Sequence, residues 1–155
     1  MKFGQIYLVL AFIIVSGCAT QQSAVDPVEG ELSLTVNITG IKDVNGVIRV
    51  ALYNGKSRWL NVKQAVRGRL QFIQSSEEQL TFHGLAAGEY AVAVFQDENL
   101  NNKMDKRWWF IPSEPFGFSN NTVKRTSVGP PSYKKAKFTL DEDKEIDINL
   151  IKIFK

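Results

Sequence analysis

Apolar and polar residues alternate along most of the chain beyond residue 30, and this period of two is typical of half-buried β-strands. The alternation predicts strands at residues 32–39, 47–53, 70–73, 79–82, 90–96, 136–140 and 146–150. No stretch has the apolar spacing of an amphipathic helix of three or more turns. About seven short strands without a long helix predict an all-β fold, a single antiparallel β-sandwich.

The segments between the strands indicate turns and one longer covering loop. An Asn-Gly pair at residues 45–46 tolerates the positive φ of a tight turn, so we expect a hairpin between the first two strands. Residues 54–68 are expected to form a loop or short helix that covers one edge or end of the sheet. Residues 129–133 contain two prolines and are expected to form a rigid extended segment.

The first residues have the features of a lipoprotein signal peptide. Lys2 supplies a positive charge, and residues 6–15 are a run of ten apolar residues. This run is too short for a transmembrane helix, which needs about 20. Residues 15–18 read Val-Ser-Gly-Cys, and this sequence resembles the bacterial lipobox. We therefore expect residues 1–17 to be a signal peptide and the Cys18 thiol to carry lipid; an ordinary signal peptide or a buried core helix is the alternative.

These features also divide the chain. Residues 18–29 are small and polar and are expected to form the lipidated cysteine and a flexible tether, and residues 30–155 to form the β-sandwich domain. Ala19 follows the cysteine where inner-membrane lipoproteins have aspartate, which resembles the outer-membrane sorting pattern of Gram-negative bacteria. We expect a protein that is lipid-anchored at the cell envelope, on the outer membrane facing the periplasm in a Gram-negative host.

Composition and charge remove several classes of function. The 155 residues include one cysteine and one histidine, which excludes an intrachain disulfide framework, a thiolate zinc cluster and a multi-histidine metal site. The net charge of +3 is small and scattered, so nucleic acid is not an expected partner. His83 is the one candidate for a catalytic base, and the spacing assembles no Ser-His-Asp or Cys-His arrangement around it. We therefore expect that the protein is not an enzyme.

A loop rich in oxygen-bearing side chains follows the apolar strand at residues 90–96. The candidate calcium ligands are the side chains of Asp97, Asn99, Asn101 and Asp105 and the carbonyl oxygen of Lys103. Calcium prefers six to eight oxygen ligands, and alternate residues of a curled loop can face one ion. No bidentate glutamate stands at position 12 of the loop, so any affinity is expected to be weak. The alternative is a metal-free turn in which these side chains bond to their own backbone.

An aromatic segment follows this loop. The candidate ligand-binding residues are Trp108, Trp109, Phe110, Phe116 and Phe118. Proline and glycine interrupt the segment, so it is expected to be a long loop rather than a strand. Its aromatic rings are expected either to form a stacking surface for a glycan, a peptide or another small ligand, or to cap the open end of the sandwich and extend its core.

The motifs of the central and C-terminal parts resemble a known bacterial family. The residues concerned are 84–97, Asn99, Asn101, Lys103, Asp105, 111–112, Glu114, 117–121, 129–131 and 136–138. They resemble the family catalogued as domain of unknown function 2141, over nearly all of residues 31–151. The resemblance implies a small secreted or envelope protein with a prealbumin-like (transthyretin-like) Greek-key sandwich, and it implies no particular activity. Leu100 and Asn102 stand where the family usually has glycine, and Trp109 lies where glycine is frequent.

Two functions remain after these exclusions. The first is a non-catalytic, membrane-tethered β-sandwich that binds or scaffolds an unknown envelope protein or glycan through the loops at residues 97–105 and 108–118. The second is a carrier that holds a glycan, a peptide or another small ligand in a pocket under the aromatic segment. A concave pocket lined by these aromatic residues favours the carrier, and a flat, filled sandwich end favours the scaffold.

Overall fold

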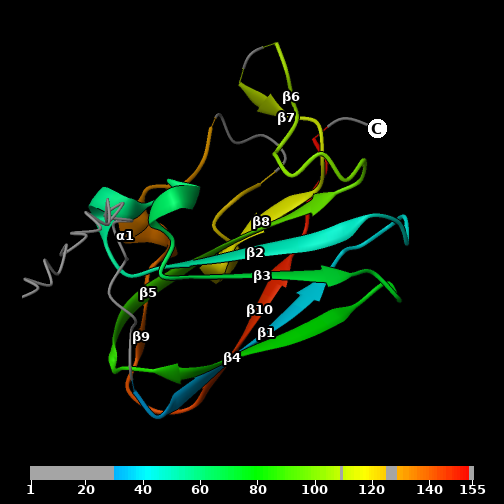
Figure 1. Cartoon of the computed structure of the whole chain (residues 1–155). Helices are drawn as coiled ribbons and strands as arrows, with labels where there is room; N and C mark the ends of the chain where they lie inside the picture. The colour runs from blue at the N-terminus through cyan, green and yellow to red at the C-terminus, as the bar shows by residue number, and fades with distance from the viewer. Residues whose placement is uncertain (1–29, 109, 125–128, 154–155) are drawn as a thin grey trace, which may run out of the picture.

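The computed structural model describes residues 30–108, 110–124 and 129–153, which fold mainly into two packed β-sheets (Figure 1). The first sheet has the strand order β10-β1-β4, and the second has the order β3-β2-β5-β8, with β9 also on β5. The strands of the first sheet are β1 (Leu32–Thr39), β4 (Glu78–Leu85) and β10 (Lys144–Asn149). The strands of the second are β2 (Val47–Tyr53), β3 (Arg67–Phe72), β5 (Gly88–Asp97), β8 (Phe116–Phe118) and β9 (Phe138–Leu140). The predicted all-β, sandwich-like fold is confirmed.

The hydrophobic core lies between the two sheets and follows the alternation in the sequence. Leu34, Val36 and Ile38 of β1 are buried from one side, and Val92 and Val94 of β5 are buried from the other. Successive residues of a strand point to opposite faces, so β1, β2 and β5 each give alternate side chains to this core. Full burial of such a side chain contributes about 1.5–3 kcal/mol, which makes this face the main source of stability.

The first two strands lie in different sheets, so the predicted hairpin between them is wrong. β1 pairs antiparallel with β4 and parallel with β10, whereas β2 pairs with β3 and β5. The Asn-Gly pair does form a turn, since Gly46 has a φ of 71°, but this turn lies in the crossing from one sheet to the other. Both strands have an apolar face, and these faces are buried when the strands oppose each other across the core.

A short 3-10 helix, η3 (Ser119–Asn121), connects several strands through its side chains. The Ser119 hydroxyl accepts a hydrogen bond from the Val92 amide at 2.9 Å and donates one to the Ala136 carbonyl at 2.6 Å. The side-chain amides of Asn120 and Asn121 donate to backbone carbonyls beside β9 and on β10, respectively. The residues after β8 therefore join the strands of both sheets.

The longer connections contain only short helices. The segment expected to be a loop or short helix contains the 3-10 helices η1 (Lys56–Arg58) and η2 (Val62–Gln64), with Trp59 between them. One helical turn, α1 (Tyr133–Ala136), occupies the end of the expected extended segment and the start of the predicted last-but-one strand. No helix in the described residues is long and apolar enough to cross a membrane.

The predictions for the N-terminal part lie outside the described residues. They are the signal peptide at residues 1–17, lipidation of Cys18 and the tether at residues 18–29. The described domain begins at Gly30, whose amide donates to the Gly84 carbonyl at 3.1 Å.

Replacement of Gly46 tests the crossing between the sheets. A Cβ at this position would lie 2.1 Å from the Asp97 carbonyl oxygen, while a Cβ at Gly129 would have no atom within 4 Å; both glycines have positive φ. The left-handed backbone costs an alanine about 1–2 kcal/mol at either site, and the clash adds about 1–3 kcal/mol at Gly46 alone. We expect Gly46→Ala to lower the urea midpoint clearly more than Gly129→Ala. Equal losses would contradict the close crossing.

Candidate functional site

The last residue of β5, Asp97, has a completely buried carboxylate. Its Oδ2 accepts a hydrogen bond from Nε of Arg49 on β2 at 2.7 Å, and Asn102 N donates to the same oxygen at 2.9 Å. The Asn101 amide donates to Oδ1 at 3.0 Å. Arg49 also donates through Nη2 to the Asn102 side-chain oxygen. The carboxylate thus fixes the arginine and the start of the loop at residues 97–105.

These contacts decide the protonation of Asp97. Burial by itself raises the pKa of the Asp97 carboxyl, but the hydrogen bond from Arg49, the amides of Asn102 and Asn101 and the charge of Arg49 together outweigh it. The net result is a pKa below the ordinary value of an aspartate. The ionised form therefore stabilises the folded state above that ordinary value, and this contribution is lost as the pH falls through the lowered pKa.

The loop closes on itself through its asparagines. The side-chain amides of Asn99 and Asn101 donate to Oδ2 of Asp105 at 2.7 Å and 2.9 Å. Leu100 and Asn102 have φ values of 61° and 68°, so the two residues that replace the family's usual glycines adopt the left-handed conformation all the same. Every one of the predicted loop side chains therefore lies in one compact turn.

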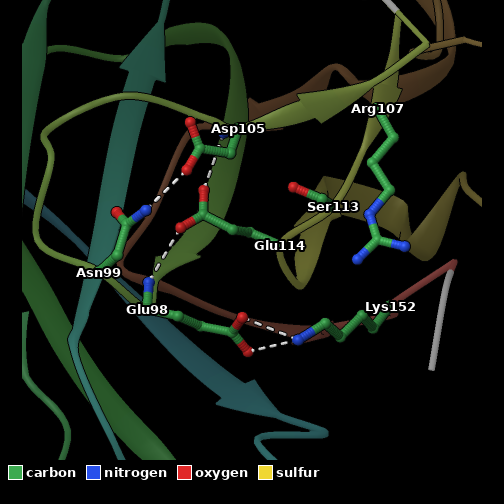
Figure 2. A pocket seen from close by; sticks show the side chains of 7 residues that line it. All are labelled: Glu98, Asn99, Asp105, Arg107, Ser113, Glu114 and Lys152. Atoms are coloured by element: carbon green, nitrogen blue, oxygen red, sulfur yellow. Dashed lines mark hydrogen bonds and ion pairs between the residues drawn. The ribbon is translucent and has the colours of Figure 1, made fainter.

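Glu114 holds the two ends of this turn (Figure 2). Its position in the sequence predicts no such contact, and only the family resemblance pointed to this residue. It is buried, and its two carboxylate oxygens accept from the amides of Glu98 at 3.0 Å and Asp105 at 2.9 Å. Burial raises the pKa of Glu114, and the charges of Asp105 and Asp97 raise it further, while the two amide hydrogen bonds offset only part. Its ionisation therefore opposes folding as the pH rises through the raised pKa.

A small polar pocket lies beside Glu114, and Lys152 near the C-terminus lines it (Figure 2). Its other lining residues are Glu98, Asn99, Asp105, Arg107 and Ser113. Nζ of Lys152 contacts both carboxylate oxygens of Glu98 at 2.7 Å. The backbone of Ile151 exchanges two hydrogen bonds with Phe116 of β8. The loop is thus attached to the sheet on one side and to the C-terminal segment on the other.

The contacts of the loop bear directly on the calcium prediction. Calcium coordination would require the amides of Asn99 and Asn101 to turn their oxygens towards Asp105, and the Arg49 guanidinium competes for Asp97. The described residues contain no group of three or more His, Cys, Asp or Glu that is placed to hold a metal ion. The metal-free turn accounts for the contacts as they stand, and calcium binding stays a prediction.

A second feature is a large groove on the outer face of the second sheet, with a volume of about 840 Å³. Cross-strand pairing places Gly68, Ala51, Ala93 and Phe118 in one row across β3, β2, β5 and β8. All four line the groove. Three of them carry no more than a methyl group, so this row forms a trough between the larger side chains of the neighbouring rows.

One wall of the groove is a segment that aromatic contacts hold in place, and its residues Leu60, Val62 and Ala65 line the groove. The ring of Trp59 lies 5.3 Å from that of Tyr53, 5.7 Å from that of Phe118 and 6.0 Å from that of Tyr133. Its indole nitrogen donates to the Pro131 carbonyl at 2.8 Å. Tyr53 and Phe118 line the groove themselves, so the segment with η1 and η2 encloses one end of it.

The opposite wall is a hairpin that pairs with neither sheet. It consists of β6 (Lys106–Arg107) and β7 (Ile111–Pro112) and rises above the sandwich in Figure 1. Lys106, both residues of β7 and Phe110 at the hairpin tip line the groove. Together with Met104, they extend the apolar surface of the sheet upward.

The predicted aromatic residues fall into three groups. Phe110, Phe116 and Phe118 line the groove; the last two are buried in β8, a strand that the sequence did not predict. Trp108 is 73% exposed near the hairpin tip and is not among the lining residues. Trp109 lies outside the described residues. The described part of the segment therefore contributes buried rings as well as rings that line the groove, and ligand binding by these residues stays a prediction.

His83, the single candidate base, lies elsewhere. It belongs to β4 in the first sheet, is exposed, and contacts the Ser33 hydroxyl through Nδ1 at 3.0 Å. It lines neither the polar pocket nor the groove.

The sequence motifs and this fold agree with a comparison against known families. A family model described as an uncharacterized protein conserved in bacteria, domain of unknown function 2141, matches residues 36–149. The chain belongs to this family, as the resemblance predicted. Neither the curated proteins nor the solved structures contain a match to it.

The pH dependence of stability tests the role of Asp97. Asp97→Asn removes the partner of a largely buried arginine, so we expect a loss of about 2–4 kcal/mol in the free energy of unfolding at neutral pH. The gap between the two proteins should narrow as the pH falls below the ordinary pKa of an aspartate, and it should close as the pH falls through the lowered pKa of the native carboxylate. Urea unfolding over a pH series measures this gap, and Asp141→Asn in an exposed turn is the control. A difference in stability that stays constant with pH would contradict the conclusion that the ionised Asp97 carboxylate stabilises the fold.

Glu114 and Glu98 form a matched pair of substitutions in one pocket. Glu114→Gln leaves a buried amide facing an –NH₂ group, so we expect a loss of about 1–3 kcal/mol in the free energy of unfolding. Glu98→Gln only weakens a partly exposed ion pair with Lys152 and should cost about 0.2–1 kcal/mol. Denaturant unfolding at neutral pH separates the two. Losses of equal size would show that Glu114 does not hold the loop.

Proposed function

We propose that this protein is a non-catalytic binding protein of the bacterial cell envelope that carries an apolar ligand in the groove over its second sheet. The observation that carries the proposal is the groove itself, whose volume of about 840 Å³ lies in the range of small-molecule sites. Its lining is mostly aliphatic and aromatic, from the sheet floor to the hairpin wall.

Exposed apolar side chains at the groove support this proposal. Val62 is 75% exposed, Phe110 58% and Leu70 48%, and all three line the groove. Large apolar side chains gathered around one concavity are unfavourable in water unless a ligand or partner covers them. A filled and flat sandwich end, which favours a scaffold, would leave no such concavity.

The chemistry of the lining favours an aliphatic ligand over a glycan. Each buried methylene group contributes about 0.8 kcal/mol, so affinity for an alkyl chain grows with every carbon that the groove covers. A glycan needs many hydrogen-bonding partners, and the floor of Gly68, Ala51 and Ala93 offers no polar side chain. Lipidation of Cys18, if it occurs as the sequence predicts, would hold the groove near a source of such chains.

Filling the groove from its floor tests the proposal. A Cβ at Gly68 meets no atom closer than 3.9 Å, and β3 is an edge strand, so Gly68→Phe adds a ring to the groove without disturbing the core. We expect the neutral probe N-phenyl-1-naphthylamine to bind the full chain with a saturable rise in fluorescence. Gly68→Phe should weaken this binding about tenfold or more, which corresponds to about 1.4 kcal/mol.

The control adds the same ring outside the groove. Thr139 is an exposed residue of β9, and Thr139→Phe should leave the affinity for the probe unchanged. Any binding of the probe to lipid or to the signal peptide is the same in both variants, so it does not affect the difference between their affinities for the probe. Equal binding by Gly68→Phe and Thr139→Phe, or no saturable binding by the native chain, would overturn the proposal.

A further inference from the structure

The groove has a polarity along the strands that bears on its ligand. Its charged residues are Arg49, Arg69, Lys103 and Lys106, and no Asp or Glu is among its described lining residues. The Arg69 guanidinium donates to the Thr81 carbonyl of the other sheet and is therefore directed away from the groove.

The remaining cations come from the side of the 97–105 loop. Arg49 is held by Asp97 and by Asn102, and Lys103 follows Asn102 directly. The side chains of Lys103 and Lys106 are exposed, and no ion pair to either is recorded in the described part of the chain. Two exposed ammonium groups thus stand at an apolar groove. The Asp97 carboxylate is buried and paired with Arg49, and the carboxylate of Asp105, next to Lys106 in the chain, accepts from the side-chain amides of Asn99 and Asn101.

The described residues that line the other end of the groove carry no charge. Tyr53 lies four residues beyond Arg49 along β2, which separates the two ends by about 13 Å. Around Tyr53 the lining consists of Leu60, Val62, Ala65 and Pro130. The surface is therefore basic at one end and apolar over the rest of its length.

We infer that the ligand of the groove is an aliphatic carboxylate, that is, a fatty acid. Its carboxylate faces Lys103 and Lys106, and its alkyl chain runs along β2 towards Tyr53, over the low row of Gly68, Ala51 and Ala93. This inference rests on the proposed function, and it adds the charge of the head group.

Competition between matched amphiphiles tests the inference. Tetradecanoate, 1-tetradecanol and a lysophosphatidate with the same chain are used to displace N-phenyl-1-naphthylamine from the full chain. We expect tetradecanoate to displace the probe about fivefold better than the alcohol, since two exposed ion pairs contribute this much together. Salt should reduce the advantage, because it screens exposed charges.

Paired lysine variants locate the head group. In the double variant Lys103→Gln/Lys106→Gln, tetradecanoate and 1-tetradecanol should displace the probe equally well. The affinity for the alcohol should stay the same as in the native chain. The control Lys134→Gln/Lys135→Gln removes the same charge from exposed positions on α1 and should keep the fivefold preference. Loss of the preference in the control as well would assign it to net charge and overturn the placement of the head group.

The remaining outcomes separate this inference from the proposed function. Equal displacement by the acid and the alcohol in the native chain would overturn the acidic head group and leave the apolar groove intact. Stronger displacement by the lysophosphatidate would replace the carboxylate by a phosphate and overturn the fatty acid. Probe binding that no alkyl chain displaces would overturn the aliphatic ligand, and absence of probe binding would overturn the proposed function with it.

Discussion

A carboxylate that is removed from water, as that of Asp97 is, needs charge and hydrogen bonds around it, because an unpaired buried charge costs several kcal/mol. Arg49 and two loop amides meet this need. In doing so they fix the path of residues 97–105, and Glu114 then fixes where that path ends. The hairpin of β6 and β7 begins at that point, so one buried charge determines the position of one wall of the groove.

The alternation of apolar and polar residues was enough to predict most strands of the two sheets and their core face, because burial of every second side chain is a local property of a strand. It missed β8, whose Phe-Gly-Phe sequence is too short to show the alternation. It did not predict the partners of each strand, since a period of two says nothing about which sheet a strand joins; the supposed first hairpin failed for this reason. The groove was missed because Ala51, Ala93 and Gly68 are far apart in the sequence and form a trough only after three strands are aligned. The contact of Glu114 with the loop was not predicted either, because no regular spacing relates Glu114 to the amides of Glu98 and Asp105 that it binds.

The motifs that place this chain in its family describe mainly how the molecule is held together. Asp97 and Glu114 bind backbone amides, and Ser119, Asn120 and Asn121 bind the backbone of strands from both sheets. Much of the groove floor, including Gly68 and Ala51, lies outside these motifs. Membership in the family therefore describes how the fold is held together, and it leaves the surface of the groove to be described for each member separately.

The floor of the groove also has an evolutionary consequence. Its depth comes from the small side chains of Gly68, Ala51 and Ala93 on the outer face of β3, β2 and β5, and none of these three residues belongs to the hydrophobic core between the sheets. A single methyl group added at Gly68, Ala51 or Ala93 would make the trough shallower or shorter, while the packing that stabilises the fold stays the same. The shape of this surface can therefore change by single substitutions that leave the core between the sheets untouched.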